Sequence, residues 1–436
     1  MPAIKSTSET SEPQHIGKYR VLGNLGRGAT ACVYRAHDSF RDAEVAIKVF
    51  DANAFSGNDG ELARNGFFVE ASLLGKLDHP HIVRVFDACT GPDDYYIVSE
   101  YVPGGTLKDF TAHGRLMDVE PAIDVAFKIV KALQYLHANG VIHRDIKPEN
   151  IFVGDGTDVK LGDFGAATIA GFSMSQIVEI GSPFYMSPQR LEGAEADVQS
   201  DIFSVGVLFY QLLTGKRPFE AGSIAALVYQ MHSLVPPAPS VVRNTVPAAI
   251  DAIVSRALSP SLPTRYANWD QFAEDLSALF RTRDGRIRRE LLVTASGRFE
   301  VLRQLSFFST FSAIELWEVV DRSEFQRVVE GDMLMREGEQ GVEFLVLVEG
   351  SARIVKNGKA IDIVQAPSTL GEIVYVLKGK VPRNASVVVI EDGLVLRMSL
   401  EAVGMLSSHC RGKLEQRFLE ILALRLIDIN RRLSYS

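Results

Sequence analysis

The sequence predicts an α+β fold with two successive folded parts, and three observations support this prediction. Over residues 19–281, short strand patterns come first, and segments with helical spacing of apolar residues follow. After residue 299, short strand patterns alternate with glycine-containing turns, which is typical of a barrel or jelly roll. Residues 282–299 begin with a strongly basic stretch, which indicates a linker between the two parts.

The composition is that of an ordinary water-soluble protein. The 436 residues are 46% hydrophobic and 23% charged, and the net charge of -8 indicates no general affinity for nucleic acid or anionic membranes. No run approaches the roughly 18 apolar residues of a membrane span. Cys32, Cys89 and Cys410 lie far apart, so we expect a reducing, cytoplasmic location. Residues 1–18 are rich in Ser, Thr, Glu and Pro, and we expect them to form a disordered tail.

Two glycines and a lysine are the notable residues of the first strands. Gly26 and Gly28 lie between two strand patterns, where glycine lets backbone amides approach phosphate oxygens closely. Lys48 lies inside the apolar strand pattern 44–50, where a lysine is costly unless it is paired. Glu70, on the next helical segment, is the candidate partner. A hairpin turn and a solvated edge lysine are the alternative interpretations.

The densest polar cluster is His-Arg-Asp-Ile-Lys-Pro-Glu-Asn at residues 143–150. It follows a helical segment over residues 121–139, and it combines acidic, basic and amide groups. A hairpin pattern over residues 151–161 comes next, and then Asp-Phe-Gly at residues 163–165. Taken alone, the cluster is also compatible with a solvated loop that contains ordinary turn residues.

The order of these motifs resembles the eukaryotic-type protein kinase family over residues 19–281. The matching features are the glycine segment, Val-Ala-Ile-Lys ending at Lys48, the helix glutamate, His-Arg-Asp with its asparagine, and Asp-Phe-Gly. The resemblance implies a bilobal protein kinase fold. It also implies transfer of the γ-phosphoryl group of ATP, with Mg²⁺, to a hydroxyl of a protein substrate.

The same resemblance implies roles for residues of the polar cluster. Asp145 would be the catalytic base that accepts the proton of the substrate hydroxyl. Lys147 would contact the γ-phosphate, and its presence favours Ser/Thr over Tyr as the acceptor. Asn150 and Asp163 would hold Mg²⁺, which prefers hard oxygen ligands.

The ATP-binding residues implied by the family come mainly from the first strands. Lys48 would hold the α- and β-phosphates and would itself be fixed by Glu70. Ser99 occupies the gatekeeper position, and its small side chain would leave an open pocket behind adenine. The implied nucleotide-binding set is Leu25, Gly26, Arg27, Gly28, Ala29, Thr30, Ala31, Cys32, Val33, Ala46, Lys48, Glu100 and Val102.

Three positions depart from the family pattern without touching the phosphoryl-transfer groups. Ala31 replaces the third glycine of the loop, and we expect altered affinity rather than inactivity. Gln189 replaces a family glutamate that pairs with an arginine, which is Arg265 in this chain. Gln189 would keep a hydrogen bond to Arg265 but would lose the charge of the glutamate. We expect this loss to loosen the substrate-binding lobe. Ser182 replaces a threonine and keeps its hydroxyl. An inactive pseudokinase is the alternative.

Arg144 precedes the expected base. In the family, such an arginine often pairs with a phosphorylated residue of the activation loop. The candidates here are Thr168, Ser173 and Ser175, and we expect autophosphorylation in this segment. The alternative is that these residues are ordinary loop hydroxyls.

Residues 300–410 resemble a cyclic-nucleotide-binding domain. Leu-Gly-Glu-Ile from Leu370, followed by Pro-Arg-Asn-Ala-Ser at residues 382–386, resembles that family's phosphate-binding cassette. Glu372 would accept a hydrogen bond from the ribose 2′-hydroxyl, and Arg383 would pair with the cyclic phosphate. A short helix from Glu372 would point its amides at the same anion. The implied site is Gly371, Glu372, Ile373, Arg383, Asn384, Ala385 and Ser386.

Two features of the cassette keep an alternative open. Residues 365–369 lack the usual Gly-Asp, and residues 374–381 form a slightly longer stretch than is common. In the alternative, Glu372 and Arg383 form a buried salt bridge in a barrel that binds no nucleotide. Asn384 is neither the alanine typical of cAMP sites nor the threonine associated with cGMP sites, and we favour cAMP.

The last segment, residues 411–436, predicts a helix with apolar residues at three- and four-residue steps. It would either pack on its own barrel or form a homodimer. Together, the patterns predict a Ser/Thr protein kinase regulated by a cyclic nucleotide. The alternatives are an active kinase whose barrel serves only for docking or dimerisation, and a non-catalytic nucleotide-sensing scaffold.

Overall fold

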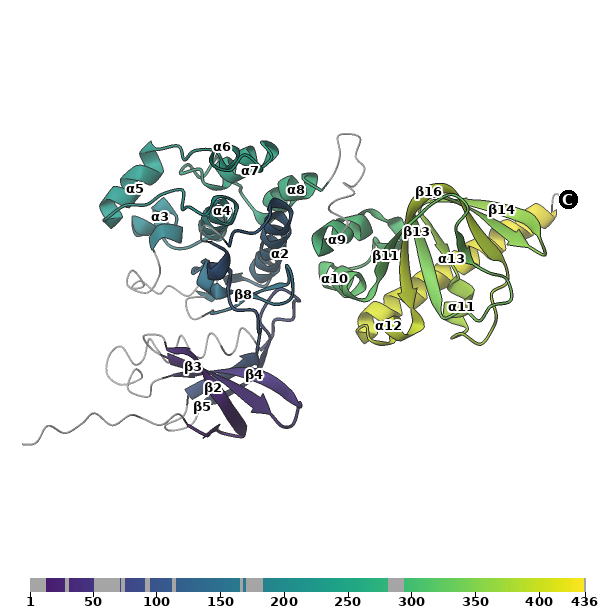
Figure 1. Cartoon of the computed structure of the whole chain (residues 1–436), viewed down its shortest axis with the longest axis horizontal. Helices are drawn as coiled ribbons and strands as arrows, with labels where there is room; N and C mark the ends of the chain where they lie inside the picture. The colour runs from purple at the N-terminus through teal and green to yellow at the C-terminus, as the bar shows by residue number, and fades with distance from the viewer. Residues whose placement is uncertain are drawn as a thin grey trace, which may run out of the picture. The chain divides into compact units, whose positions relative to one another are not determined.

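The computed structural model divides the chain into two compact units, Met1–Leu279 and Phe280–Ser436 (Figure 1). We refer to them as the kinase unit and the barrel unit, and describe each by itself. The residues that the structure describes are 13–27, 31–50, 71, 75–90, 95–111, 115–164, 168–169, 183–280 and 294–434.

The described strands of the kinase unit's first half form a six-stranded antiparallel sheet in the order β1-β2-β3-β4-β6-β5. Alternation of apolar residues builds its buried face: Val45 and Ile47 of β4 are fully buried, together with Val98 of β6. The strands are β1 (His15–Ile16), β2 (Tyr19–Arg27), β3 (Ala31–Asp38), β4 (Ala43–Phe50), β5 (Val85–Thr90) and β6 (Tyr95–Glu100).

Helices dominate the second half of the kinase unit, where α2 packs against α4 and α8. Helix α4 is buried along nearly its whole length; it begins with a capping box between Asp197 and Ser200 and ends at Gly215 in the left-handed conformation. The helices are α2 (Val119–Ala138), α3 (Pro188–Leu191), α4 (Val198–Thr214), α5 (Ile224–Ser233), α6 (Pro239–Val242), α7 (Ala249–Ala257) and α8 (Trp269–Ala278), with 3-10 turns at Leu107–Phe110, Pro148–Asn150 and Pro183–Tyr185.

Four short strands lie on this helical half and carry the catalytic segments. They are β7 (Val141–Ile142), β8 (Ile151–Val153), β9 (Val159–Leu161) and β10 (Thr168–Ile169). Strands β8 and β9 form the expected hairpin, and β10 pairs with β7. The segment 143–150 therefore follows β7, which pairs with β10, and precedes β8, which pairs with β9. Strand pairing fixes the backbone at both ends of the segment.

The barrel unit begins with α9 (Ala295–Gln304), so folded structure starts inside the predicted linker 282–299, of which residues 282–293 lie outside the described part. A 3-10 turn (Ser306–Phe308) and α10 (Ala313–Arg322) follow. The sheet order is β11-β16-β13-β14, with β12 on β16 and β15 on β13. The strands are β11 (Glu324–Val328), β12 (Met333–Met335), β13 (Glu343–Lys356), β14 (Lys359–Gln365), β15 (Ser368–Leu370) and β16 (Ser386–Ser399).

The prediction of many short strands was wrong for the centre of this sheet. The apolar runs at 344–348 and 352–355 predict two strands separated by a turn, but both belong to one strand, β13. The runs at 386–390 and 394–398 likewise belong to one strand, β16. Register shifts near Gly350 mark bulges in the β13–β16 pairing, and a side chain at Gly393 would clash with the Glu349 carbonyl. The glycines therefore mark bulges inside long strands, not turns between short ones.

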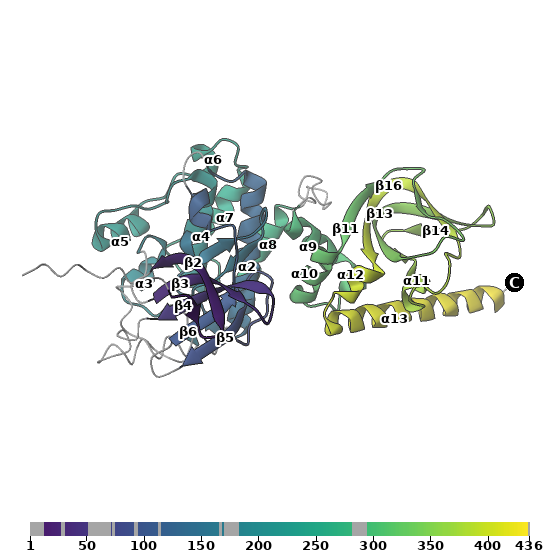
Figure 2. The same ribbon diagram turned by 60° about the horizontal axis from the view of Figure 1, so that its bottom comes forward.

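The chain ends with α11 (Glu372–Val376) in the cassette, then α12 (Leu400–Gly404) and the long α13 (Ser408–Ser434). Figure 2 shows α13 running along the barrel beside α11, which it contacts. Phe418 of α13 is fully buried, with its ring centroid 4.8 Å from that of Phe344 and 4.9 Å from that of Tyr375. This aromatic cluster fixes the first half of α13 to the barrel.

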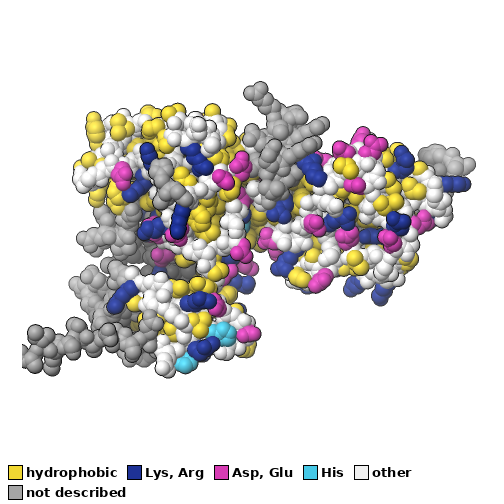
Figure 3. Space-filling model, in the orientation of Figure 1, with side chains coloured by type: hydrophobic (Ala, Val, Ile, Leu, Met, Phe, Trp, Pro, Cys, Tyr) yellow, Lys and Arg dark blue, Asp and Glu magenta, His cyan; other side chains and the backbone are white. Residues whose placement is uncertain are grey.

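Two surface properties bear on the expected partners. No helix among the described residues combines the length and the apolar character needed to cross a bilayer. On the face drawn in Figure 3, side chains of Lys and Arg are interspersed with those of Asp and Glu on each unit. Such mixing gives no large single-sign field on this face.

Candidate functional site

Three residues of the predicted catalytic segment meet in the structure. Lys147 Nζ lies 2.6 Å from Asp145 Oδ2. Asn150 Nδ2 donates to the Asp145 carbonyl at 2.7 Å and to its Oδ2 at 2.9 Å. Asn150 is buried, and the 3-10 turn that contains it sets its side chain against the aspartate. The structure thus brings together the expected base, the phosphate lysine and one metal ligand.

A second charged pair joins the sheet to the catalytic half. Lys48, on β4, lies with its Nζ 2.8 Å from Oδ1 of Asp163, which follows β9. Burial of Asp163 alone would raise its pKa. The positive charge and hydrogen bond of Lys48, together with smaller contributions from His143 and Lys147, outweigh the effect of burial. The pKa of Asp163 is therefore lowered. Glu70, the expected partner of Lys48, lies outside the described residues.

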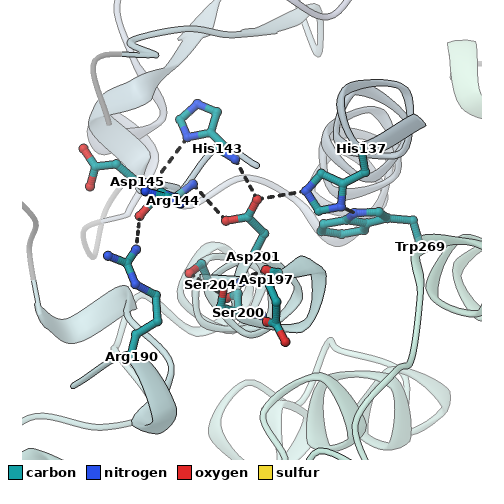
Figure 4. Close-up of polar contacts among 10 residues, drawn as sticks. All are labelled: His137, His143, Arg144, Asp145, Arg190, Asp197, Ser200, Asp201, Ser204 and Trp269. Atoms are coloured by element: carbon teal, nitrogen blue, oxygen red, sulfur yellow. Dashed lines mark hydrogen bonds and ion pairs between the residues drawn. The ribbon is translucent and has the colours of Figure 1, made fainter. Parts of the chain in front are cut away.

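Asp201 of α4 supports the catalytic segment from below (Figure 4). Its Oδ2 accepts the His143 backbone amide at 2.9 Å, and its Oδ1 accepts that of Arg144 at 3.0 Å. Arg144 has φ of 70°, a conformation that a residue with a side chain holds only when its surroundings enforce it. The buried Asp201 carboxylate supplies that enforcement.

Asp201 is in turn tied to the last helix of the kinase unit. His137 Nε2 lies 3.0 Å from Asp201 Oδ2, and Trp269 Nε1 donates to His137 Nδ1 at 2.6 Å (Figure 4). An indole is a donor only, so His137 Nδ1 is the acceptor and its Nε2 carries the proton given to Asp201. Helices α8, α2 and α4 are therefore joined to the catalytic segment by one chain of hydrogen bonds.

Strand pairing builds the part of the site that is predicted to bind adenine. Ala46 of β4 lies opposite Ser99 of β6, and Ser99 Oγ donates to the Ala46 carbonyl at 3.4 Å. The Glu100 carboxylate pairs with Lys160 at 3.2 Å. A Cβ at Gly26 would meet no protein atom within 4 Å, so internal packing does not require this glycine. Of the nucleotide-binding set, residues 28–30 lie outside the described part.

The barrel unit places the two key cassette residues in its interior. Arg383 is 8% exposed and Glu372 is 3% exposed. Within the described residues, Arg383 Nη1 and Glu372 Oε2 are buried without a hydrogen-bond partner. Gly371, with φ of 80°, and Gly341 pack so closely on the Arg383 guanidinium that a side chain at either position would crowd it. The site is thus shaped around an arginine that retains an unused donor.

The Glu372–Arg383 salt bridge of the alternative interpretation is not formed. Glu372 Oε1 instead pairs with Arg425 of α13, which also donates to the Thr369 carbonyl at 2.8 Å. Of the other cassette residues, Ser386 Oγ accepts the Glu337 amide at 2.9 Å, and Ile373 lies at the surface.

The geometry of the kinase unit agrees with sequence comparison. A model of the protein kinase domain matches residues 19–265, more than half of the 436 residues. The chain belongs to the protein kinase family. A model of the cyclic nucleotide-binding domain matches residues 325–409 of this kinase.

Curated relatives of this kinase are bacterial. A probable serine/threonine-protein kinase of Streptomyces coelicolor is 38% identical over 284 residues, covering 61% of this chain and 41% of the relative. Serine/threonine-protein kinase PrkC of Bacillus subtilis is 36% identical over 271 residues, covering 61% and 40%. Probable serine/threonine-protein kinase PknB of Lactococcus lactis is 35% identical over 263 residues, covering 60% and 42%. The kinase therefore spans about four-tenths of the length of these relatives.

The expected contact between Gln189 and Arg265 is confirmed. Arg265 is buried, which lowers its pKa to about 10, and its Nη2 donates to Gln189 Oε1 at 3.0 Å. Gln189 also donates from Nε2 to the Pro260 carbonyl at 2.6 Å. A glutamate could not make this second bond, so the amide compensates in part for its missing charge.

Two arginines, Arg144 and Arg190, are joined by a hydrogen bond at the predicted catalytic segment. Arg190 Nη1 donates to the Arg144 carbonyl at 2.9 Å, and Arg144 Nε is buried without a hydrogen-bond partner among the described residues. Burial and then the charge of Arg190 lower the pKa of Arg144. Thr168 lies on β10, opposite Ile142, whereas Ser173 and Ser175 fall outside the described residues.

The sequence-based prediction missed the supporting residues of both sites. Asp201 belongs to no recognised motif, although an acid in so apolar a segment signals a required partner. His137, Trp269 and Arg425 carried no local signal, because their partners lie 64, 132 and 53 residues away along the chain.

Proposed function

We propose that this chain is a serine/threonine protein kinase that transfers the γ-phosphoryl group of MgATP to protein hydroxyls, and that a cyclic nucleotide bound in the barrel unit regulates it. The observation that supports catalysis most is the meeting of Asp145, Lys147 and Asn150 beside the Lys48–Asp163 pair. Lys48 and Asp163 come from positions 115 residues apart in the sequence, and a purely structural role does not require all five groups together.

Each group has a defined task in the transfer. Asp145 accepts the proton of the substrate hydroxyl as its oxygen attacks the γ-phosphorus, and ADP leaves. Lys147 neutralises negative charge on the transferred group, and Lys48 holds the remaining phosphates. The carboxylate of Asp163 and the amide oxygen of Asn150 suit Mg²⁺, which would neutralise phosphate charge. Serine or threonine as the acceptor follows from Lys147 and is supported by the names of the relatives.

In the barrel unit, two unsatisfied atoms define the ligand class. Arg383 Nη1 is a buried cationic donor, and Glu372 Oε2 is a buried acceptor. A ligand that presents an anionic oxygen and a hydroxyl satisfies both, and a cyclic nucleotide carries these groups on its phosphate and ribose. We favour cAMP over cGMP. Regulation further requires that the nucleotide bind two states of the kinase with different affinity.

Phosphorylation of the activation segment is a second regulatory element of this proposal. Arg190 Nη1 donates to the Arg144 carbonyl, and Arg144 Nε is buried without a hydrogen-bond partner among the described residues. A phosphate on Thr168, Ser173 or Ser175 would supply the missing acceptor. Peptide mapping of the purified kinase after incubation with MgATP tests this; absence of phosphate between residues 165 and 182 would overturn it.

The second half of α13 favours a further property, association of two copies. Leu419 and Leu426 are more than half exposed and lie seven residues apart, so they share one face of this helix. Exposed apolar side chains on one face are suited to a homodimer contact. The three cysteines Cys32, Cys89 and Cys410 are free, which supports a cytoplasmic location.

The main experiment is phosphate transfer from labelled ATP to a generic protein substrate, without nucleotide and with cAMP or cGMP. The wild type should label the substrate, and Asp145→Asn, which keeps shape but removes the base, should not. A cyclic nucleotide should change the wild-type rate. Equal labelling by wild type and Asp145→Asn would refute the catalytic assignment; a rate insensitive to both nucleotides would refute the regulatory one.

A further inference from the structure

Three glutamates and one arginine influence the charge state of Arg383. Burial lowers the pKa of Arg383, and the negative charge of Glu343 is the largest opposing influence. The positive charge of Arg397 lowers the pKa further, whereas Glu339 and Glu372 raise it by smaller amounts. Arg383 Nη1 is nevertheless buried without a hydrogen-bond partner among the described residues. Negative charge is therefore close to Arg383 but does not satisfy this nitrogen.

Each of these three carboxylates is already paired with another arginine. The pairs are Glu343–Arg397, Glu339–Arg336 and Glu372–Arg425. Together with Arg383, the group contains four arginines and three glutamates, so one positive charge is left over. Because the other three arginines have partners, the excess positive charge lies on Arg383 of the cassette. This arrangement matches a singly charged anion.

The Glu343–Arg397 pair lies beside the cassette. Glu343 precedes Leu345, a core residue of β13, by two positions, and Arg397 of β16 lies opposite Leu345. Residues that alternate along a strand, or that lie opposite each other, point to the same face of a sheet. Both charged residues therefore belong to the inner face of the barrel. A Cβ at Gly371 would meet both the Arg383 guanidinium and the Glu343 carbonyl oxygen, so the pair borders Arg383.

Arg397 holds Glu343 through a guanidinium that is itself anchored. Arg397 Nη1 donates to Glu343 Oε1 at 2.6 Å, and Arg397 Nε donates to Gln326 Oε1 at 2.6 Å. The Arg397 and Glu343 side chains are 21% and 25% exposed, so water and salt screen this pair less than a fully exposed one. A carboxylate held in this way is not free to turn to Arg383.

We propose that Arg397 is a positioning residue of the nucleotide site: by holding Glu343, it keeps the Arg383 guanidinium available for an anionic phosphate oxygen. Arg397 acts through Glu343 and does not contact the ligand. Without Arg397, the Glu343 carboxylate turns to Arg383 and competes with the ligand, since opposite charges attract strongly in a partly buried site. This inference rests on the proposed binding of a cyclic nucleotide by the barrel unit.

The test is calorimetric titration of the full chain with cAMP, and separately with cGMP. Arg397→Ala should weaken binding roughly tenfold to a hundredfold, because the ligand must displace a charged hydrogen bond between Glu343 and Arg383. Arg327→Ala is the matched control. Arg327 pairs with Glu349 at 3.0 Å in the same sheet, six residues beyond Glu343 on β13. This variant should bind like wild type.

A change of salt separates direct pairing from a long-range loss of charge. At about 1 M salt the Debye length is about 3 Å, so distant charges are largely screened, whereas a partly buried pair is screened much less. The weaker binding of Arg397→Ala relative to wild type should therefore persist at high salt.

A double-variant cycle tests the role of Glu343. Glu343→Gln keeps the shape of the side chain but removes the competing charge, and it should bind at least as tightly as wild type. In this background, Arg397→Ala should cause little further loss, because no carboxylate remains to turn to Arg383. Thermal unfolding of each ligand-free variant checks that the protein is folded.

These results separate the role of Arg397 from nucleotide binding itself. If wild type binds cAMP or cGMP and Arg397→Ala binds as tightly, the positioning role is overturned while nucleotide binding stands. Weak binding by Glu343→Gln, an equal loss from Arg397→Ala in that background, or a loss that disappears at high salt would also overturn it. If wild type binds neither nucleotide, the proposed ligand is wrong, and the role of Arg397 falls with it.

Discussion

The two proposed nucleotide sites of this chain hold their charges in opposite ways. In the kinase unit, the described functional groups pair with each other: Lys48 with Asp163, and Lys147 with Asp145. In the barrel unit, Arg383 and Glu372 of the cassette are both buried, yet each keeps a polar atom without a hydrogen bond among the described residues.

The difference corresponds to the two proposed functions, phosphotransfer in the kinase unit and ligand binding in the barrel unit. A phosphotransfer site must exchange partners in each cycle, and internal ion pairs keep its charges satisfied until substrate phosphates and metal replace them. A regulatory site must retain its ligand, and a preorganised buried arginine lowers the reorganisation needed on binding. Such preorganisation is costly without ligand, because a buried charge lacks its full set of partners.

The largest expected effect tests the kinase side of this comparison. Asp145→Asn should reduce kcat by roughly 10²–10⁴, because the amide cannot accept the substrate proton. Steady-state phosphotransfer measures this, with thermal unfolding as the check on folding. Activity within a few-fold of wild type would mean that Asp145 is not the base.

The next effect tests the barrel side. Arg383→Ala should weaken cAMP binding by about 2–5 kcal/mol, since it removes the charged partner of the phosphate. It should not lower the melting temperature of the ligand-free protein, because it also removes a buried cation with an unsatisfied donor. Arg353→Ala, on the exposed side of β13 in the same barrel, serves as the control. A large loss of stability without ligand would contradict the claim that Arg383 is kept for binding.

A smaller effect is expected from the support of the catalytic segment. Trp269→Phe keeps an aromatic ring but removes the donor to His137, and it should lower the free energy of unfolding by about 1 kcal/mol. Differential scanning calorimetry measures the change. A variant as stable as wild type would show that the Trp269–His137 bond does not support the catalytic segment.

The smallest effect concerns Gln189. Gln189→Glu strengthens the bond to Arg265 but loses the bond to the Pro260 carbonyl and places two oxygens against each other. The two changes should nearly cancel, leaving the free energy of unfolding within about 1 kcal/mol of wild type. Urea denaturation measures it. A stabilisation of several kcal/mol would show that the missing charge, not the amide bond, dominates this contact.

Prediction from sequence succeeded where the functional groups are neighbours in the chain. Asp145, Lys147 and Asn150 lie within one loop, so their order alone indicated their meeting. The sequence also placed Arg383 and Glu372 in one cassette. Prediction failed where the partner is distant in the chain: Asp201 accepts a hydrogen bond from the His143 amide 58 residues away, and Arg425 pairs with Glu372 across 53 residues. Local patterns carry no information on which distant side chain completes a site.

Glycine caused the clearest error in the fold. A glycine between two apolar runs predicts a turn, and near Gly350 and Gly393 this rule divided β13 and β16 into short strands. The structure uses these glycines where bulged strands approach so closely that a Cβ would clash with the neighbouring backbone. A turn and a bulge both need glycine, and only the pairing partner distinguishes them.

The most direct test of the whole account is the initial rate of phosphotransfer by the full chain, with and without saturating cAMP, for wild type and Arg383→Ala. We predict that cAMP changes the wild-type rate and leaves the rate of Arg383→Ala at its ligand-free value. An equal response of both proteins to cAMP, or no response of the wild type, would contradict the claim that the buried arginine of the barrel controls the catalytic loop.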